Sequence, residues 1–348
     1  MSSMQLCLLT NINWPTMNES RMRTKRMRVS LAGCGSIGRR HLANLRKLTA
    51  HCPAEIFIYD VSLAASHAVS HEFDATPVPH LDALWDVRPD IALICTPSHL
   101  HTACALAAAH AGAALFIEKP VAHSLAGLEE LTALAEALNL ISLVGCNMRF
   151  HPGPAQIQRW LIQGAIGDLQ SARLHTGSYL PNWRPQQDYR ESYSASCEHG
   201  GAILDCIHEI DLALWMLGPA HLHAALVRPA AALGLHTDGL AEILLAHETG
   251  TISSLHLNFL QRNYARHIEI IGDTGTLTWN YQSGETSHYG PDGQRVHTHC
   301  QEPDWQPNKM YEAELAYFLG CLQCGEQTFN PISNAIATLR LALQARNS

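Results

Sequence analysis

The sequence is poor in lysine, in charged residues overall and in long apolar runs. Only four of its 348 residues are lysines, and charged residues make up 16% of the chain against 47% hydrophobic residues. Disorder requires fewer apolar and more charged residues, so this composition excludes a largely disordered protein. No apolar run approaches the roughly 18 residues that cross a membrane, which excludes a transmembrane helix. The length favours about two domains, each large enough to bury its own core.

Acidic residues outnumber basic ones, 31 to 23, which gives a formal net charge of −8. A net negative charge does not favour binding to negatively charged nucleic acid, so we expect neither a nucleic-acid nor a membrane partner. The one basic cluster lies between Arg21 and Arg28, in a stretch without the pattern of a secretory signal. We interpret residues 1–26 as a disordered N-terminal extension, or as the product of a start codon upstream of Met27.

Eleven cysteines are scattered from Cys7 to Cys324 without the dense, regular spacing of a disulfide framework. An odd and irregular set of this kind is typical of reduced thiols, which predicts a cytoplasmic protein. Cys321 and Cys324 form the only CxxC pair. Because no second pair accompanies it, we favour packing within a helix over a zinc or redox site, and we expect no bound metal.

Short apolar runs alternate with Ala- and Leu-rich helical patterns between Met27 and Phe150, which is typical of a parallel sheet covered by helices on both faces. The predicted strands are 28–32, 55–59, 91–95, 113–117 and 141–144. The clearest predicted helices are 99–111 and 125–138. We therefore assign residues 27–150 to a doubly wound α/β domain.

Beyond Pro152 a helical pattern at 155–163 is followed by longer alternating runs, which predict a mostly antiparallel open sheet. These runs are 172–179, 239–246, 251–259, 267–271 and 276–279. Two helical patterns, at 310–324 and 333–345, close the chain. We assign residues 151–348 to a second α/β domain.

The motif Gly33-Cys34-Gly35-Ser36-Ile37-Gly38 follows the first predicted strand and opens a helix. In a βαβ unit, such glycines allow a tight turn, close approach of the backbone to a pyrophosphate, and packing of the helix on the strand. Asp60 comes 22 residues after Gly38, at the end of the second strand. A carboxylate there accepts from a ribose hydroxyl and repels a 2′-phosphate. These residues predict an NAD site, although Arg39 and Arg40 leave NADP possible.

Lys119 follows the predicted strand 113–117, at the carboxyl edge where open α/β sheets bind ligands. It is the only lysine between Lys47 and Lys309, so it does not belong to a lysine-rich surface. Pro120 restricts it to an extended backbone, which would hold its ammonium in a fixed direction. Since most lysines at strand ends are merely solvated, position alone leaves a catalytic and a structural role equally open.

Gly200 and Gly201 precede a helical pattern in which spacings of three residues place Asp205, His208 and Asp211 on one face. A carboxylate beside a histidine orients and tunes the imidazole for proton transfer near neutral pH. An Asp-x-x-His pair also resembles two metal ligands, but no third ligand is evident. We therefore predict an acid–base pair rather than a metal site.

Arg184 and Arg190 lie in a stretch rich in aromatic residues. Guanidinium groups match carboxylates and phosphates, so these arginines predict an acidic or nucleotide-linked sugar as substrate, with Tyr189 also contacting it. In the alternative interpretation, the two arginines pair with Asp188 and Glu191.

Taken together, the motifs resemble those of the Gfo/Idh/MocA oxidoreductases, the family of glucose-fructose oxidoreductase and inositol 2-dehydrogenase. The resemblance runs from about Met27 to Ala345 and rests on the glycine motif, Thr96-Pro97-Ser98-His99-Leu100-His101, Glu118-Lys119-Pro120, Gly145-Cys146-Asn147-Met148-Arg149-Phe150 and Asp205-x-x-His208. The family implies an NAD(P)-binding Rossmann domain and hydride transfer at a sugar or cyclitol carbinol. It also implies that the second domain binds substrate and mediates assembly into a homodimer or homotetramer.

The same resemblance implies roles for individual residues. The residues expected to border the cofactor are Thr96, Pro97, Ser98, His101, Glu118 and Lys119. Those expected to be catalytic and to contact the substrate are Lys119, Asp205 and His208, while Asn147 and Arg149 are expected to face the cofactor and substrate cleft. The family usually has three residues between the Asp and the His, whereas this chain has two. Asp205 is therefore expected to point differently from its usual counterpart.

We therefore predict an NAD(P)-dependent dehydrogenase or reductase that acts on the CH–OH group of a sugar, sugar acid, nucleotide sugar or cyclitol. His208 would take the hydroxyl proton and Lys119 would stabilise the oxyanion. One alternative is a redox-neutral enzyme that uses NAD transiently, as a glycoside hydrolase or a sugar–sugar oxidoreductase. Another is a non-catalytic sugar or nucleotide sensor, against which the presence of both Lys119 and His208 speaks.

Overall fold

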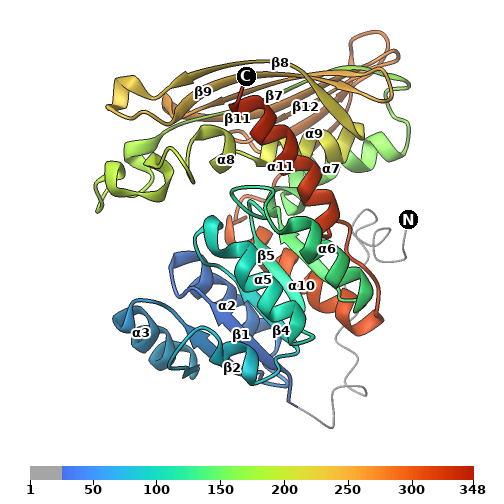
Figure 1. Ribbon diagram of the computed structural model, residues 1–348. Helices are drawn as coiled ribbons and strands as arrows, with labels where there is room; N and C mark the ends of the chain where they lie inside the picture. The colour runs from blue at the N-terminus through green and yellow to red at the C-terminus, as the bar shows by residue number, and fades with distance from the viewer. Residues whose placement is uncertain (1–25) are drawn as a thin grey trace. The chain divides into compact units, whose positions relative to one another are not determined.

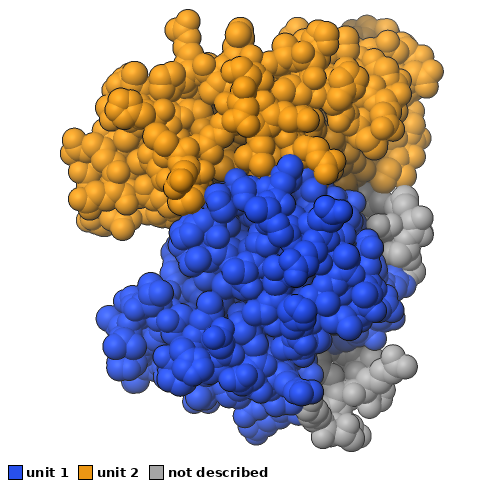
Figure 2. All heavy atoms as spheres, in the orientation of Figure 1, with its two compact units in different colours: residues 1–147, 306–336 blue, residues 148–305, 337–348 orange. Residues whose placement is uncertain are grey.

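The computed structural model describes residues 26–348. Residues 1–25, which hold most of the predicted N-terminal extension, lie outside this range. The chain divides into two compact units (Figure 2). The first unit contains the residues up to Asn147 and Gln306–Ile336, and the second contains Met148–Trp305 and Ala337–Ser348.

The sheet of the first unit has six strands within residues 26–348, in the order β3-β2-β1-β4-β5-β6. They are β1 (Arg28–Ala32), β2 (Glu55–Tyr59), β3 (Thr76–Pro77), β4 (Ile91–Ile94), β5 (Ala114–Glu118) and β6 (Ser142–Gly145). All neighbouring strands pair in parallel. The predicted doubly wound parallel sheet is confirmed, and its order reverses between β1 and β4, where such sheets bind nucleotides.

Helices connect the strands of this sheet (Figure 1). The helices of the first unit are α2 (Ser36–Leu48), α3 (Leu63–Phe73), α4 (Ala83–Asp86), α5 (His101–His110), α6 (Leu128–Ala137) and α10 (Asn308–Cys324). None of the helices within residues 26–348 is both long enough and apolar enough to cross a membrane.

The late helix α10 belongs to the first unit, whereas the sequence pattern alone assigns it to the second domain. Its Phe318 ring packs edge-on against Phe116 of β5, with ring centroids 5.6 Å apart. The segment after α10 then covers the edge of β6, because the Val144 amide donates to the Asn330 carbonyl and the Asn330 side chain donates to the Val144 carbonyl. This long-range packing places residues 306–336 with the parallel sheet.

The second unit contains an eight-stranded sheet in the order β14-β13-β12-β11-β7-β10-β9-β8. Its strands are β7 (Leu169–Tyr179), β8 (Ala220–Pro229), β9 (Asp238–His247), β10 (Ile252–Asn258), β11 (Leu260–Gly272), β12 (Thr276–Asn280), β13 (Glu285–Tyr289) and β14 (Arg295–Cys300). Only β10 and β7 pair in parallel among these strands. The predicted mostly antiparallel sheet is confirmed.

The two faces of this sheet differ. Helices α7 (Pro152–Ile162), α8 (Ala202–Asp205) and α9 (His208–Leu217) pack against one face (Figure 1). The other face carries a row of three stacked histidines, with His175 of β7 between His256 and His267 and ring centroids 4.6 Å apart in each pair. The C-terminal helix α11 (Ile332–Arg346) runs from the first unit into the second.

Candidate active site

The glycine motif forms the turn from β1 into α2. Gly33 has φ +98°, and a side chain there would come within 2.5 Å of the Cys95 carbonyl at the end of β4. A side chain on Gly38 would lie 2.1 Å from the Gly33 carbonyl, whereas one on Gly35 would meet nothing within 4 Å. The first and third glycines are thus required by the fold, and the second leaves open space beside the helix N-terminus. This arrangement fits a bound pyrophosphate.

Asp60 lies at the end of β2 and its carboxylate accepts two backbone hydrogen bonds. The donors are the Cys34 amide and the Ser62 amide, each 2.8 Å away. A carboxylate has about four lone-pair sites, so Asp60 keeps acceptor capacity for ribose hydroxyls. Arg39 is engaged by Glu72, and the Arg40 guanidinium lies 4.4 Å from the centre of the Tyr311 ring. Both arginines that leave NADP possible therefore already have partners.

Replacing Asp60 by Asn should weaken NADH binding by about 10- to 100-fold, because a hydrogen bond to a charged group contributes about 1.5–3 kcal/mol. The preference for NADH over NADPH should narrow at the same time, since the carboxylate no longer repels the 2′-phosphate. Asn keeps one oxygen, which can accept from the Cys34 amide or from the Ser62 amide but not from both, so the variant removes the charge together with one backbone hydrogen bond. Fluorescence titration with both cofactors measures the effect, and tighter binding of NADPH by the wild type contradicts it.

Lys119 directly follows β5, and Glu118 beside it is buried. The Glu118 carboxylate contacts His41 Nε2 of α2 at 2.6 Å and accepts a hydrogen bond of 3.2 Å from the Lys119 amide. His41 is absent from the site residues that the sequence motifs predict. The clue that the sequence offers to this role is that His41 comes three residues after Gly38, on the side of α2 that faces the sheet. The pair holds the backbone at Lys119 in place.

His101 plays a similar supporting role for the loop after β4. It is buried, and its two ring nitrogens lie 2.8 Å from the Thr96 carbonyl and 2.9 Å from the Pro120 carbonyl. Burial lowers the pKa of His101 against the raising effect of these two carbonyls. The imidazole thus joins the segment Thr96-Pro97-Ser98 to the segment that carries Lys119. Asn147, the last residue of the first unit's N-terminal segment, is buried in a short 3-10 turn.

A pocket of about 430 Å³ lies within the second unit and contains both predicted acid–base residues, Asp205 and His208. We call it the His208 pocket. Its lining is Thr176, Ser178, Tyr179, Asn182, Trp183, Asp205, Cys206, His208, Arg262, Tyr264 and Arg266. The Trp183 indole donates a hydrogen bond of 2.9 Å to Ser178 Oγ and is still 39% exposed. The pocket therefore combines an aromatic face with several polar groups, as small-molecule sites do.

Asp205 and His208 do not share one continuous helix, and that expectation is wrong. Asp205 ends α8 and His208 begins α9, with Cys206 and Ile207 between them. The start of α8 is held by Asp238 of β9, whose carboxylate accepts from the Ile203 amide at 2.8 Å. Asp238 lies 35 residues from Ile203 in the chain, so residue spacing does not reveal this contact.

Two buried ion pairs hold the start of α9. The Arg149 guanidinium binds Asp211 through two hydrogen bonds of 2.8 and 2.7 Å, and both side chains are almost fully buried. Arg266 Nε donates to Glu209 Oε1 at 2.6 Å. Burial alone would lower the pKa of Arg266, but the Glu209 carboxylate raises it above its ordinary value. Arg149, expected to face the cleft, therefore lies in a buried pair and does not line the His208 pocket.

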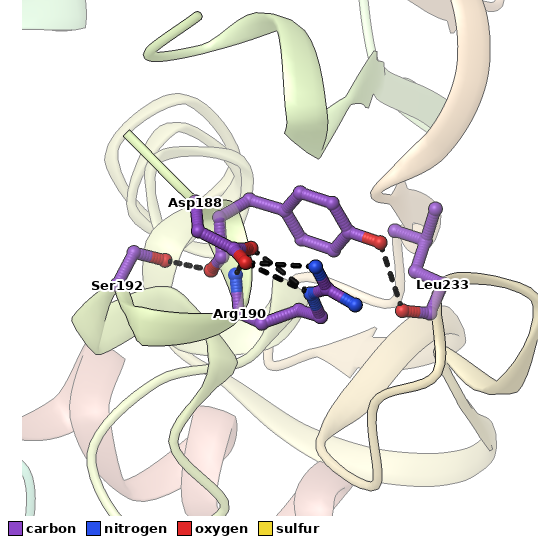
Figure 3. A network of polar contacts seen from close by, with 5 residues as sticks. Asp188, Arg190, Ser192 and Leu233 are labelled. Atoms are coloured by element: carbon purple, nitrogen blue, oxygen red, sulfur yellow. Dashed lines mark hydrogen bonds and ion pairs between the residues drawn. The ribbon is translucent and has the colours of Figure 1, made fainter. Parts of the chain in front are cut away.

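The arginines singled out by the sequence have other partners. Arg190 binds Asp188, with Nη2 and Oδ2 2.8 Å apart, which is the pairing that the alternative interpretation expected (Figure 3). Tyr189 donates through its hydroxyl to the Leu233 carbonyl at 3.1 Å. The Arg184 guanidinium lies 5.5 Å from the centre of the Tyr193 ring. None of these three residues lines the His208 pocket.

Within residues 26–348 no group of three or more His, Cys, Asp and Glu side chains is arranged to hold a metal ion. Cys321 of the CxxC pair is fully buried in α10, and burial raises the pKa of its thiol to about 11.

Fold and glycine turn together define a dinucleotide-binding domain joined to a second α/β unit. The sequence matches the oxidoreductase family with an NAD-binding Rossmann fold over residues 27–146. It also matches the GFO/IDH/MocA C-terminal domain over residues 155–278. The chain belongs to the Gfo/Idh/MocA oxidoreductase family, as predicted, and it is an NAD-dependent enzyme.

Similarities to individual proteins and solved structures are consistent with membership of this family. The chain is 28% identical to the uncharacterized oxidoreductase YrbE of Bacillus subtilis over 261 residues, which cover 73% of each protein. It is 29% identical to the inositol 2-dehydrogenase of Acidothermus cellulolyticus over 262 residues, or 72% of each protein. Among solved structures, a levoglucosan dehydrogenase in complex with NADH and levoglucosan has the same fold, with a TM-score of 0.81 at 19% identity, over 93% of this chain and 98% of that one.

Proposed function

We propose that the protein transfers hydride between NAD and a CH–OH carbon of a sugar or cyclitol that binds in the His208 pocket. The observation that carries this proposal is that Asp205 and His208 both line one polar, partly aromatic pocket of a chain with an NAD-binding domain. Relatives named for inositol and levoglucosan support a polyhydroxylated substrate.

In the oxidative direction His208 takes the proton of the substrate hydroxyl. The glycine turn and Asp60 would hold NAD, which would supply the acceptor for the hydride that departs from the carbinol carbon with both bonding electrons. Lys119 stabilises the negative charge that develops on the substrate oxygen. Asp205 orients the substrate or the imidazole, while the Glu118–His41 contact and His101 fix the segment that bears Lys119.

A panel of sugars, sugar acids and cyclitols tests this function in the presence of NAD. We expect steady production of NADH with at least one polyhydroxylated compound. A redox-neutral hydrolase, a sugar–sugar oxidoreductase or a sensor would give no net NADH, and that result across the panel would contradict the proposal.

We further propose that the protein is a cytoplasmic homo-oligomer that assembles through the histidine-bearing face of the second unit's sheet. Leu226, Ile252 and Ile271 lie on that face with 75%, 52% and 37% exposure. Exposed apolar side chains on one face are typical of a protein–protein contact. None of the ten described cysteines forms a disulfide, which fits a reducing compartment.

Replacing Ile252 by Asp should shift the oligomer toward monomer, because a carboxylate would have to be buried without a partner. Sedimentation equilibrium of the wild type and the variant measures this shift. The exposed Val61 of the first unit, replaced by Asp, serves as the control. A wild type that is monomeric at micromolar concentrations would rule out the assembly.

A further inference from the structure

The His208 pocket has a basic side formed by β11. Arg262 and Arg266 both line the pocket from this strand. Between Leu260 and Ala265, β11 advances five residues while the paired strand β7 advances two. The extra residues form a bulge, and bulges re-aim side chains next to active sites. Arg262 lies within the bulged segment, so its direction is set by this irregularity rather than by regular strand pairing.

Arg266 is the buried member of this basic side, at 8% exposure. The one hydrogen bond that its side chain forms with a described residue runs from Nε to Glu209, so neither Nη atom has an acceptor within residues 26–348. A guanidinium has five N–H donors in a planar fork, which matches the two oxygens of a carboxylate or phosphate. Glu209 balances the charge of Arg266. The contribution of Arg266 to the pocket is therefore its fixed N–H donors rather than a net positive charge.

Arg262 is the exposed member, and its guanidinium lies 3.8 Å from the centre of the Tyr179 ring. Among the described residues no carboxylate forms an ion pair with it. A cation over an aromatic face is attracted to it, which holds the side chain at the edge of the pocket without neutralising its charge. Arg262 is therefore the arginine of the pocket whose charge is available to a ligand.

We propose that the substrate of this enzyme carries an anionic group, a carboxylate or a phosphate, that binds Arg262 and the Nη atoms of Arg266. The sugar ring lies against the exposed face of Trp183, with its reacting hydroxyl toward His208. This inference rests on the proposed function of the same pocket. It transfers the anionic specificity that the sequence suggested for Arg184 and Arg190 to two different arginines.

Calorimetric binding to the NADH-loaded protein tests the proposal with D-glucose, D-glucuronate and D-glucose 6-phosphate. We expect at least one of the two anionic sugars to bind about tenfold or more tighter than D-glucose, and the comparison of the two identifies the anion. Replacing Arg262 by Gln should weaken binding of that sugar by about 10- to 100-fold, because a charge-assisted hydrogen bond is lost. D-Glucose binding should change little in this variant.

Arg295 provides a matched control. It lies on β14 of the same sheet, 5.7 Å from the centre of the Tyr289 ring, but pairs with Glu285 and does not line the pocket. R295Q should bind the anionic sugar like the wild type. Equal binding of all three sugars, no binding of either anion, or equal losses in R262Q and R295Q would overturn the proposal. Because the readout is binding, absence of NADH production would contradict only the proposed function.

Discussion

Replacing His208 by Ala is expected to lower kcat by about 10²- to 10⁴-fold, the usual contribution of a general acid or base. Lys119→Ala should cause a loss of the same order, and NAD affinity should change little in both variants because neither residue is needed for the adenosine half. The two effects should not multiply, since both groups act on one proton in one transition state. The kcat of the double variant should therefore be only slightly lower than that of the slower single variant. Single-turnover hydride transfer and NAD titration measure these quantities.

Asp205→Asn provides a graded comparison, and we expect a milder loss than in His208→Ala unless Asp205 sets the imidazole tautomer. Wild-type rates in His208→Ala would mean that the proton acceptor lies elsewhere, with Lys119 the next candidate. Tyr189, which the sequence predicted to contact the substrate, is a weaker candidate because its hydroxyl already donates to the Leu233 carbonyl.

Replacing Asp211 by Ala is expected to lower the free energy of unfolding of the second unit by about 3–5 kcal/mol, the usual cost of removing one partner of a buried ion pair. The Arg149 side chain would stay 4% exposed without the carboxylate that balances its charge. Because Asp211 lies in α9, which begins at His208, kcat should fall together with stability. Urea unfolding followed by circular dichroism measures the change.

Two further variants separate this effect from a general sensitivity to lost carboxylates. Asp188→Ala removes the partner of Arg190 on the exposed surface and should leave the unfolding midpoint unchanged. Joint replacement of Arg149 by Met and Asp211 by Leu should recover much of the loss, because apolar side chains often replace a buried pair without penalty. An Asp211→Ala variant as stable as the wild type would show that the pair does not hold α9.

The sequence predicts those parts of the candidate site whose position depends only on local backbone geometry. The glycine motif and Asp60 lie at the carboxyl ends of β1 and β2, so a strand prediction is enough to place them. Lys119 could be located in the same way from the end of β5. His41 and Asp238 were missed because their roles depend on partners 77 and 35 residues away in the chain. Hydrogen-bond partners at such separations leave no periodic pattern.

The arginines show most clearly that sequence spacing does not identify partners that are distant in the chain. The sequence analysis chose Arg184 and Arg190 because they lie near aromatic residues in the chain, and Arg190 instead binds its neighbour Asp188. The arginines that line the His208 pocket, Arg262 and Arg266, both come from β11, Arg262 from its bulge and Arg266 from the regularly paired part that follows. Composition and spacing identify a guanidinium but not the cavity that it faces.

The sequence by itself determined the parallel sheet, the cofactor turn and the antiparallel character of the second sheet. Buried parallel strands read as continuous apolar runs and half-buried strands alternate, so both patterns are local. The predicted strands of the second unit omit β8, β13 and β14; nearly all residues of β14 are exposed, so no buried face marks it. Only the tertiary structure decided that α10 packs on the first unit, that α8 and α9 break between Asp205 and His208, and which arginines line the pocket. Each of these depends on side chains that meet across long stretches of chain, and their packing and ion pairs outweigh local helical preference.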